Sequence, residues 1–276
     1  MTNDKQIVGT VPGACSHIPH RSHMGTTLLK RYRRMPQHQA HLLGMHGRAD
    51  LHMHSTYSDG IVTIEQILEH VEHSSELDVI AITDHDTIEG ALRARDLRAK
   101  RSYHFDFIVG EEITTNEGHL LALSIEKCIP PGLSIERSID LVHEQGGLAI
   151  VAHPLHPFFR ECCRREVLDR LYAHLDIWLD GIESWNAGFF GIYTNPATMS
   201  ANRQVYGWPE IGNSDSHSLY AIGRGFTWFK GTSAQDLHAS IQAGLCAPGG
   251  KLWGVGDYLH LASYYMNKRL ADQRIA

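Results

Sequence analysis

The sequence predicts an α/β protein in which about seven strand–helix units close into a barrel. The chain has 276 residues, which suits one large domain with a buried core. From residue 49 onward, short apolar runs alternate with stretches of helical periodicity, a pattern that favours parallel strands joined by right-handed crossovers. About seven such units favour a closed barrel over an open sheet.

The individual elements follow from the hydrophobic pattern along the chain. We expect strands at residues 49–53, 79–82, 107–109, 120–124, 148–152, 181–183 and 210–212. We expect helices near residues 63–75, 87–100, 134–145, 164–174, 195–206 and 233–243. A tail at 255–272 keeps helical spacing through Val255, Leu259, Ala262, Met266 and Leu270, so we expect it to pack on the outside of the barrel.

The first 48 residues differ in composition from the rest of the chain. They are rich in Gly, Pro and His and contain a basic cluster, Lys30, Arg31, Arg33 and Arg34, without a sustained apolar period. We expect residues 1–48 to form a poorly ordered N-terminal extension and residues 49–276 to form one domain that includes the helical tail. The basic cluster is interpreted as a solvated surface.

Composition argues against several classes of protein. The net charge of −6 disfavours a nucleic-acid-binding surface of Lys and Arg, although metal ions can still attract a small phosphate-bearing substrate. The five cysteines include no CxxC pair, so they favour a reducing, cytoplasmic environment over a disulfide framework. No apolar run approaches the length of a membrane span, and no obligate protein partner is indicated.

Residues of metal-binding type recur where the predicted strands begin or end. Twenty residues are histidine, and His52 and His54 alternate on the first strand, so their side chains face the same side. Further strands are followed or opened by His85, Glu111, Glu112, His119, His153, Asp215 and His217. Because the carboxyl ends of barrel strands meet at one rim, these residues alone predict a metal site at the barrel mouth.

Six motifs in this region together resemble those of the PHP (polymerase and histidinol phosphatase) family. In chain order they are Asp-Leu-His-Met-His-Ser-Thr-Tyr-Ser-Asp-Gly at 50–60, Ile-Thr-Asp-His-Asp-Thr at 82–87, Gly-Glu-Glu-Ile at 110–113, His119, Ala-His-Pro at 152–154 and Gly-Asn-Ser-Asp-Ser-His at 212–217. They follow the family's order and extend over roughly residues 49 to 250. The resemblance implies a distorted (β/α)7 TIM-like barrel, the PHP fold.

The resemblance also implies two or three divalent metal ions, with Mn²⁺, Zn²⁺ and Fe²⁺ as the candidates. It assigns the first ion to His52, His54, Glu112 and Asp215, the second to Glu112, His119 and His153, and the third to Asp59, His85 and His217. Glu112 would then bridge the first two ions. Adjacent residues of a strand point to opposite sides, and the family's spacing favours Glu112 over Glu111 as the residue that faces the mouth.

Two aspartates flank His85 and have other expected roles. Asp84 is expected to orient a metal-binding imidazole, as carboxylates commonly do. Asp86 is interpreted either as a similar orienting group or as the N-cap of the helix that follows.

The function implied by the resemblance is hydrolysis of a phosphate ester by metal-activated water. The Asp at position 59 is typical of a small branch of the family, many of whose members act on nucleotides or short oligonucleotides. We therefore expect a small phosphorylated substrate of that kind. The expected catalytic residues are His52, Glu112, Asp215, His217 and Arg224, the last as a phosphate contact.

Other interpretations remain open. Arg160 and Arg203 are weaker candidates for phosphate contact, and Trp185 and Asn186 are candidates for lining a base or sugar pocket. A metal-dependent amidohydrolase is an alternative function, although that superfamily usually has a metal-bridging Lys and none stands at a strand exit here. A non-catalytic metal-binding module is the third possibility.

Overall fold

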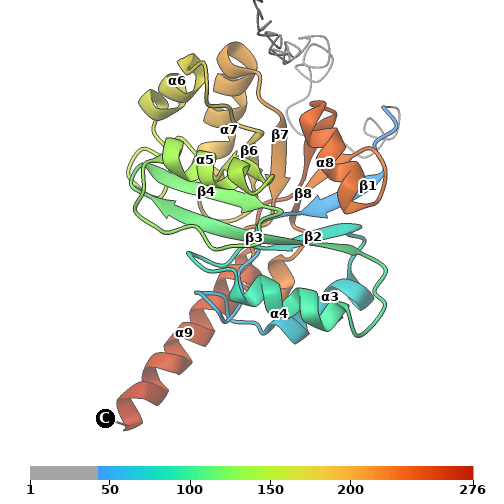
Figure 1. The fold of residues 1–276 in the computed structure, drawn as a ribbon. Helices are drawn as coiled ribbons and strands as arrows, with labels where there is room; N and C mark the ends of the chain where they lie inside the picture. Colours follow the sequence, from blue (N-terminus) through green and yellow to red (C-terminus); the bar gives the residue numbers. More distant parts are fainter. Residues whose placement is uncertain (1–42, 276) are drawn as a thin grey trace, which may run out of the picture.

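The computed structural model describes residues 43–275, and the nine strands of this part form one nearly closed, barrel-shaped sheet (Figure 1). The strands are β1 (Gly47–Asp50), β2 (Val79–Ile82), β3 (Asp106–Thr115), β4 (Gly118–Leu123), β5 (Leu148–Val151), β6 (Gly181–Asn186), β7 (Glu210–Asn213), β8 (Gly225–Phe229) and β9 (Cys246–Gly250). Their order in the sheet is β7-β6-β5-β4-β3-β2-β1-β8-β9. The predicted α/β barrel is therefore confirmed.

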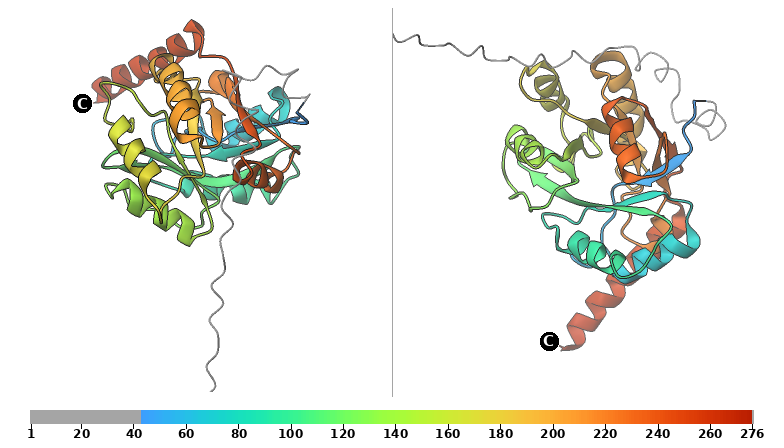
Figure 2. Two further views of the ribbon diagram at one scale, coloured as in Figure 1. Left: turned by 90° about the horizontal axis from the view of Figure 1, so that it is seen from above. Right: turned by 45° about the vertical axis from the view of Figure 1, so that its right-hand side comes forward.

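Helices lie around the outside of this sheet (Figures 1 and 2). They are α3 (Ile64–Ser74), α4 (Glu89–Arg98), α5 (Ile135–Glu144), α6 (Arg165–Ala173), α7 (Gly191–Ala201), α8 (Ala234–Gln242) and α9 (Val255–Ile275), with a π-helical turn η1 (Asn202–Tyr206) and a 3₁₀ turn η2 (Leu219–Ala221). Every strand and helix expected from the hydrophobic pattern is present, and β8 and β9 are additional.

Local sequence explains why these helices start where they do and which face they bury. Thr63 and Ser233 each begin a helix with a capping box, α3 and α8 respectively. In α5 the residues at helical spacing, Ile135, Ile139 and Val142, are buried. Burial of an aliphatic side chain of this size contributes roughly 1.5–3 kcal/mol, so a few such contacts fix each helix on the sheet.

Strand direction differs from the expectation that all strands are parallel. Strands β1, β2 and β3 are parallel, as are β5, β6 and β7, but β4 is antiparallel to both of its neighbours. Only Asn116 and Glu117 separate β3 from β4, and a parallel crossover needs a dozen or more residues, so this connection forms a hairpin. Strand β8 is likewise antiparallel to β1 and β9.

The barrel closes through contacts between the ends of β1 and β7. The backbone N–H of Leu51 donates to Oδ1 of Asn213 at 3.0 Å, and the N–H of Ser214 donates to Oδ1 of Asp50 at 3.0 Å. Two residues further along each segment, Met53 pairs in parallel with Ser216. These contacts join the first and the last of the parallel strands, β1 and β7, at the rim where the predicted ligands lie.

The N-terminal boundary of the barrel lies earlier than residue 49. Strand β1 begins at Gly47, which pairs with Phe229, and Met45 is buried against Trp228 and Ala247. Most of the predicted extension, residues 1–42, lies outside the described residues. The last residues of the predicted extension therefore belong to the barrel, because Gly47 and Arg48 lie on β1 and pair with β8.

The C-terminal helix α9 projects from the barrel (Figures 1 and 2). It contacts the barrel through Trp253, just before the helix, and through Tyr258 and Leu261, which pack near Ala187 and Ala221. The apolar stripe that the sequence indicated is exposed instead, since Val255, Leu259 and Met266 are 75%, 65% and 64% exposed. In the described residues no helix is sufficiently long and apolar to span a membrane.

Candidate metal centre

The strand ends of the barrel bring the predicted metal-binding side chains into one cluster. Its members form four groups of three: His52, Glu112 and His153; His52, His54 and Asp215; His54, His85 and Glu112; and His54, Asp59 and His217. Within each group, the nitrogen and oxygen atoms lie within 4.8 Å of one another. His119 completes the cluster, with Nδ1 2.8 Å from Oε1 of Glu112.

Glu112 lies at the centre of this cluster and is almost fully buried. Its Oε2 atom lies 2.9 Å from Nε2 of His52 and 3.2 Å from Nε2 of His54. Its Oε1 atom lies 2.8 Å from Nδ1 of His119 and 3.0 Å from Nε2 of His153. A carboxylate whose two oxygens face two different pairs of imidazoles has the geometry of a bridging ligand.

The neighbouring Glu111 points away from the cluster. Its Oε2 accepts from the backbone N–H of Ile129 at 2.9 Å, and its Oε1 accepts from the Cys128 thiol at 3.0 Å. Burial raises the pKa of Glu111 to about 7. The alternation of side chains along β3 therefore separates the two glutamates, and Glu112 is the one that faces the mouth.

Two aspartates hold the other side of the cluster. Oδ1 of Asp215 lies 3.3 Å from Nε2 of His54 and 3.5 Å from Nε2 of His52. Oδ2 of Asp59 lies 3.0 Å from Nε2 of His217, while the Asp59 side chain is 50% exposed. The cluster is thus buried around Glu112 and open to solvent at Asp59.

The β3–β4 hairpin explains how His119 reaches this rim from the start of a strand. In a parallel strand, a residue at the start lies at the opposite end of the barrel from the mouth. Because β4 is antiparallel to β3, its first residues lie beside the end of β3, where His119 pairs with Thr114. The hairpin thereby places His119 beside Glu112, which precedes it on β3.

Backbone strain accompanies two of the clustered residues. His153 and Asp215 have positive φ angles of 25° and 52°, a region that residues other than glycine adopt at a cost of about 1–3 kcal/mol. The backbone N–H of His153 donates to Oε2 of Glu183 at 2.8 Å, a buried bond that holds this conformation. Strain of this kind concentrates at functional sites.

The imidazoles and carboxylates of the cluster shift one another's pKa values. Burial disfavours protonated His52, but the carboxylates of Glu112, Asp215 and Glu183 outweigh burial and raise its pKa well above the ordinary value. Burial also opposes protonation of His54, yet the nearby carboxylates of Asp215 and Glu112 raise its pKa to about 10. Although burial alone would raise them, the pKa values of Glu112 and Asp215 are held low by the surrounding imidazoles.

Unpaired ring nitrogens indicate that metal ions fit this site. Nδ1 and Nε2 of His54 and Nδ1 of His85 are buried and make no hydrogen bond within the described part of the chain. Leaving a buried polar atom unpaired costs about 1–3 kcal/mol. Lone pairs on such nitrogens, together with carboxylate oxygens, form the mixed donor set that suits Zn²⁺, Mn²⁺ or Fe²⁺. The cluster therefore has the donors and charge of a divalent metal site.

Glu183 is a further member of the site that sequence reasoning missed. It is fully buried on β6, and its Oε1 lies 3.0 Å from Nδ1 of His52. The same carboxylate accepts from the side-chain amides of Asn186 and Asn213 at 2.9 Å and 2.8 Å. A carboxylate on the far nitrogen of a metal-binding imidazole fixes its orientation and raises its basicity. The feature of the sequence that could have identified Glu183 is its position within the buried strand Gly181–Asn186.

Asp84 and Asp86 bind backbone and hydroxyl groups rather than the groups expected from the sequence. Asp84 accepts from the N–H of Ser55 at 2.7 Å and from the hydroxyls of Ser55 and Ser58, both at 2.7 Å, so it shapes the loop that carries Asp59. Asp86 accepts from the N–H of Thr114 at 2.7 Å. The N-cap of α4 is Ile88, without a side-chain cap bond, so the N-cap interpretation of Asp86 is wrong.

The candidate substrate-binding residues are dispersed. Nη2 of Arg224 lies 3.4 Å from Oδ2 of Asp257 on α9, and the Arg203 guanidinium pairs with Glu210 at 2.7 Å, so both arginines contact carboxylates outside the cluster. Asn186 does reach the cluster, where its amide donates to Oδ2 of Asp215 at 3.1 Å. Its position indicates that it orients Asp215 within the site.

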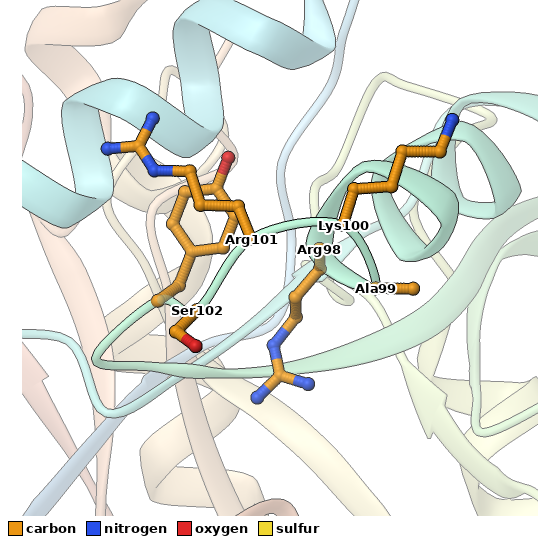
Figure 3. Close-up of a pocket in the computed structure, with 6 residues that line it drawn as sticks. Arg98, Ala99, Lys100, Arg101 and Ser102 are labelled. Carbon is orange, nitrogen blue, oxygen red and sulfur yellow. The ribbon is translucent and has the colours of Figure 1, made fainter.

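A surface pocket of about 380 Å³ lies at the opposite end of the barrel, between the end of α4 and the start of β3 (Figure 3). It is lined by Arg98, Ala99, Lys100, Arg101, Ser102 and Tyr103. Figure 3 shows the long side chains of Arg98, Lys100 and Arg101 pointing away from one another. Arg98 pairs with Asp106 and Arg101 with Glu69, so these two charges are compensated and do not form a second converging site.

Comparisons with known proteins match this fold and site. The sequence profile of the PHP domain matches residues 50–178, and that of a PHP-associated region matches residues 201–246. An uncharacterized protein of Methanocaldococcus jannaschii is 36% identical over 151 residues, 51% of this chain and 82% of that protein. A 5′-3′ exoribonuclease of Haemophilus influenzae is 33% identical over 105 residues, which span 37% of each protein.

Among solved structures, the fold is similar to that of a two-domain protein of Bacteroides vulgatus that contains a predicted PHP-like metal-dependent phosphoesterase. The TM-score is 0.61 and the sequence identity 22%, with 79% of this chain and 69% of that chain covered. At this level of identity, the likeness concerns the fold. Together with the family profiles and the archaeal relative, it leads to one conclusion: this chain belongs to the PHP domain family.

Proposed function

We propose that this protein is a metal-dependent phosphoesterase that hydrolyses a phosphate ester of a nucleotide or short oligonucleotide. The observation that carries the proposal is the position of Glu112, whose two oxygens face two pairs of imidazoles. That arrangement suits a pair of ions bridged by one carboxylate. Two neighbouring ions are the arrangement that phosphoester hydrolysis uses to clamp the attacking and leaving oxygens.

The ligand assignment we propose is the one that the family resemblance implies, and one of its three sets, His52, His54 and Asp215, is among the four groups found in the cluster. His52, His54 and Asp215 would hold one ion, and His119 and His153, whose ring nitrogens lie close to Glu112, would hold a second. Asp59, His85 and His217 would hold a third ion, and the Asp59 side chain among them is half exposed. Bound divalent ions supply Lewis acidity that neutralises phosphoryl oxygens and lowers the pKa of an attacking water.

The side chains of the protein supply position and charge for this chemistry. Glu183 holds the ring of His52 through Nδ1, which directs Nε2 toward Glu112 and Asp215. Asn186 holds Asp215 in place from the neighbouring strand. The half-exposed Asp59 leaves the third group accessible, so a phosphate can approach from solvent without displacing the buried part of the cluster.

The nucleotide part of the proposal is supported by a relative. The Haemophilus influenzae protein is a 5′-3′ exoribonuclease, and its similarity is confined to 37% of each chain. An Asp at position 59 is consistent with the small branch of the family whose members act on such substrates.

The adjacent glutamates offer a matched pair of variants as the test. Phosphate release is measured for the metal-loaded protein on nucleotides, 5′-phosphorylated oligonucleotides and sugar phosphates, with bound metal quantified in the same samples. We expect Glu112→Gln to lose bound metal and to reduce kcat by about 10²-fold or more, since removal of one group that stabilises developing charge has effects of this size. Glu111→Gln, which alters the outward-facing carboxylate, should keep both metal and activity.

Two results would contradict the proposal. One is the absence of phosphate release from every substrate by protein with full metal occupancy. The other is unchanged activity in Glu112→Gln, which would exclude the bridging role of this carboxylate.

A further inference from the structure

Five aromatic side chains gather at the barrel mouth on the segments that follow β5 and β6. They are Phe158, Phe159, Phe189, Phe190 and Tyr193, which we call the aromatic platform; Phe158 joins the others through the ring of His156, at a centroid distance of 6.3 Å. Neighbouring rings in the platform have centroid separations between 5.4 Å and 6.3 Å, for example 5.4 Å for Phe159–Phe190 and 6.2 Å for Phe189–Tyr193. These edge-to-face contacts join every ring of the platform except that of Phe158, so the other four rings form one packed surface.

One ring of the platform contacts a predicted metal ligand directly. The ring of Phe190 stacks on the imidazole of His153, with centroids 4.7 Å apart and an angle of 28° between the planes. Nε2 of the same imidazole lies 3.0 Å from the bridging carboxylate of Glu112. A phosphate placed at the cluster would therefore have its organic substituent within reach of these rings.

Much of the platform faces solvent. Phe158 is 88% exposed, Tyr193 58%, Phe189 48% and Phe159 40%. A contiguous exposed apolar surface on a folded protein marks a binding surface more often than isolated exposed residues do. Arg160, in the same segment as Phe158 and Phe159, is also exposed and adds a positive charge beside the rings.

A buried polar atom among these rings also lacks a partner. The ring of His156 contacts Phe159, Tyr193 and Phe190, at centroid distances of 4.5 Å, 5.4 Å and 5.9 Å. Its Nδ1 accepts from the backbone N–H of Phe158 at 3.3 Å, so in the neutral ring the proton resides on Nε2. That donor is buried and has no acceptor in the described part of the chain, which leaves it for an acceptor that a ligand brings.

We propose that the aromatic platform is the subsite for the nucleobase of the substrate, an inference that rests on the proposed phosphoesterase function. Each nucleobase offers a flat face for stacking on an aromatic ring and acceptors on its edge for a donor such as Nε2 of His156. A sugar phosphate without a base offers no such face. The platform therefore favours nucleotides over the corresponding sugar phosphates.

The test compares two substrates that share phosphate and ribose, adenosine 5′-monophosphate and ribose 5-phosphate. The double variant Phe158→Ala/Tyr193→Ala removes two exposed rings with little effect on the core. The control, Trp178→Ala, removes another exposed aromatic side chain, which stacks on His143 in the segment that precedes β6. We expect the double variant to reduce kcat/KM for the nucleotide by about 10- to 100-fold, the range of base–aromatic stacking, and to leave ribose 5-phosphate within about 2-fold.

A second variant distinguishes the loss of stacking from a change in the structure of the loop. Phe158→Trp keeps an aromatic face, so it should retain nucleotide turnover when Phe158→Ala loses it. Equal losses on both substrates, or no loss in the double variant, would overturn the stacking role while leaving phosphoester hydrolysis intact. Failure of the wild-type, metal-loaded protein to hydrolyse either compound would instead count against the proposed function, so the two failures are distinguishable.

Discussion

At the scale of single residues, the site depends on groups that orient the metal-binding side chains as much as on those side chains. His52 is held on one nitrogen by Glu183 at 3.0 Å and faces Glu112 with the other at 2.9 Å. Glu183 in turn accepts from Asn186 and from Asn213. This network leaves the His52 ring a single orientation, with Nε2 directed into the cluster.

The substitution Glu183→Gln should weaken metal binding because an amide cannot accept with both of its terminal atoms. Either the contact to His52 or the bond from the His153 N–H is then lost. We expect a decrease in metal affinity of about 10- to 100-fold, measured by competition with a chromogenic chelator.

The matched control is Glu210→Gln, which changes a partly buried glutamate on the adjacent strand β7, at the end far from the mouth. Glu210 pairs with Arg203, so this variant should lower stability without changing metal affinity. Equal affinities for the wild type and Glu183→Gln would exclude the orienting role.

The residues of the cluster were largely predictable because they end or begin strands, where alternation and barrel closure bring side chains together. Glu183 escaped prediction because its neighbours Ile182 and Ser184 make the run look like ordinary buried strand. The phosphate-binding role predicted for Arg224 rested only on proximity along the chain. In the structure its guanidinium contacts Asp257 and the Tyr220 carbonyl, partners on segments that the sequence pattern did not connect to it.

At the scale of secondary-structure elements, the C-terminal segment supports the solvent-facing side of the site. The indole N–H of Trp253 donates to the Ser214 carbonyl at 2.9 Å, and its ring lies 6.2 Å from that of His217. On α9, the hydroxyl of Tyr265 donates to the backbone carbonyl of Asp59. The helix that projects from the barrel therefore helps to hold the loop of the proposed third ion.

The substitution Tyr265→Phe should loosen the Asp59 loop while leaving the buried ions in place. A hydrogen bond of this kind contributes about 1 kcal/mol, so affinity for the most weakly held ion should fall by about 5-fold. Tyr264→Phe is the control, since it removes a hydroxyl from the adjacent residue. Metal titration followed by elemental analysis measures the effect, and an equal response in the two variants would exclude a specific role for Tyr265.

The elements themselves were predicted well, but strands β8 and β9 and the direction of β4 were not. Strand β9 has the sequence Cys-Ala-Pro-Gly-Gly, which resembles a turn, yet an edge strand tolerates proline. The direction of β4 was missed because the hydrophobic pattern reports strand existence, whereas direction depends on the two-residue connection between β3 and β4.

At the scale of the whole molecule, metal binding and stability are coupled. Ions that bind only the folded protein stabilise it by mass action, by about 2.7 kcal/mol for each site at a concentration of 100 times Kd. Removal of metal with a chelator should therefore lower the midpoint of thermal unfolding.

The size of that decrease should depend on pH. His52 and His54 have pKa values raised above those of the unfolded chain, so their protonated forms stabilise the metal-free fold at low pH, and this contribution is lost as pH rises toward the folded pKa. Metal binding requires the unprotonated rings, so metal is most effective where protons are fewest. We expect the difference in unfolding temperature between loaded and chelated protein to be larger at pH 8 than at pH 6, measured by calorimetry. A larger difference at pH 6 would contradict this linkage.

Barrel closure also sets the order of events during synthesis of the protein. The contact that joins β1 to β7 spans 162 residues of chain, between Leu51 and Asn213. His52 and His54 leave the ribosome long before Asp215 and His217 are made, so a nascent chain lacks Asp215 for its proposed first ion and His217 for its proposed third. The first and third of the proposed metal sites would therefore be complete only once the last parallel strand, β7, and the residues that follow it have been made, so we expect a chain that ends before Asp215 to bind less metal than the full chain.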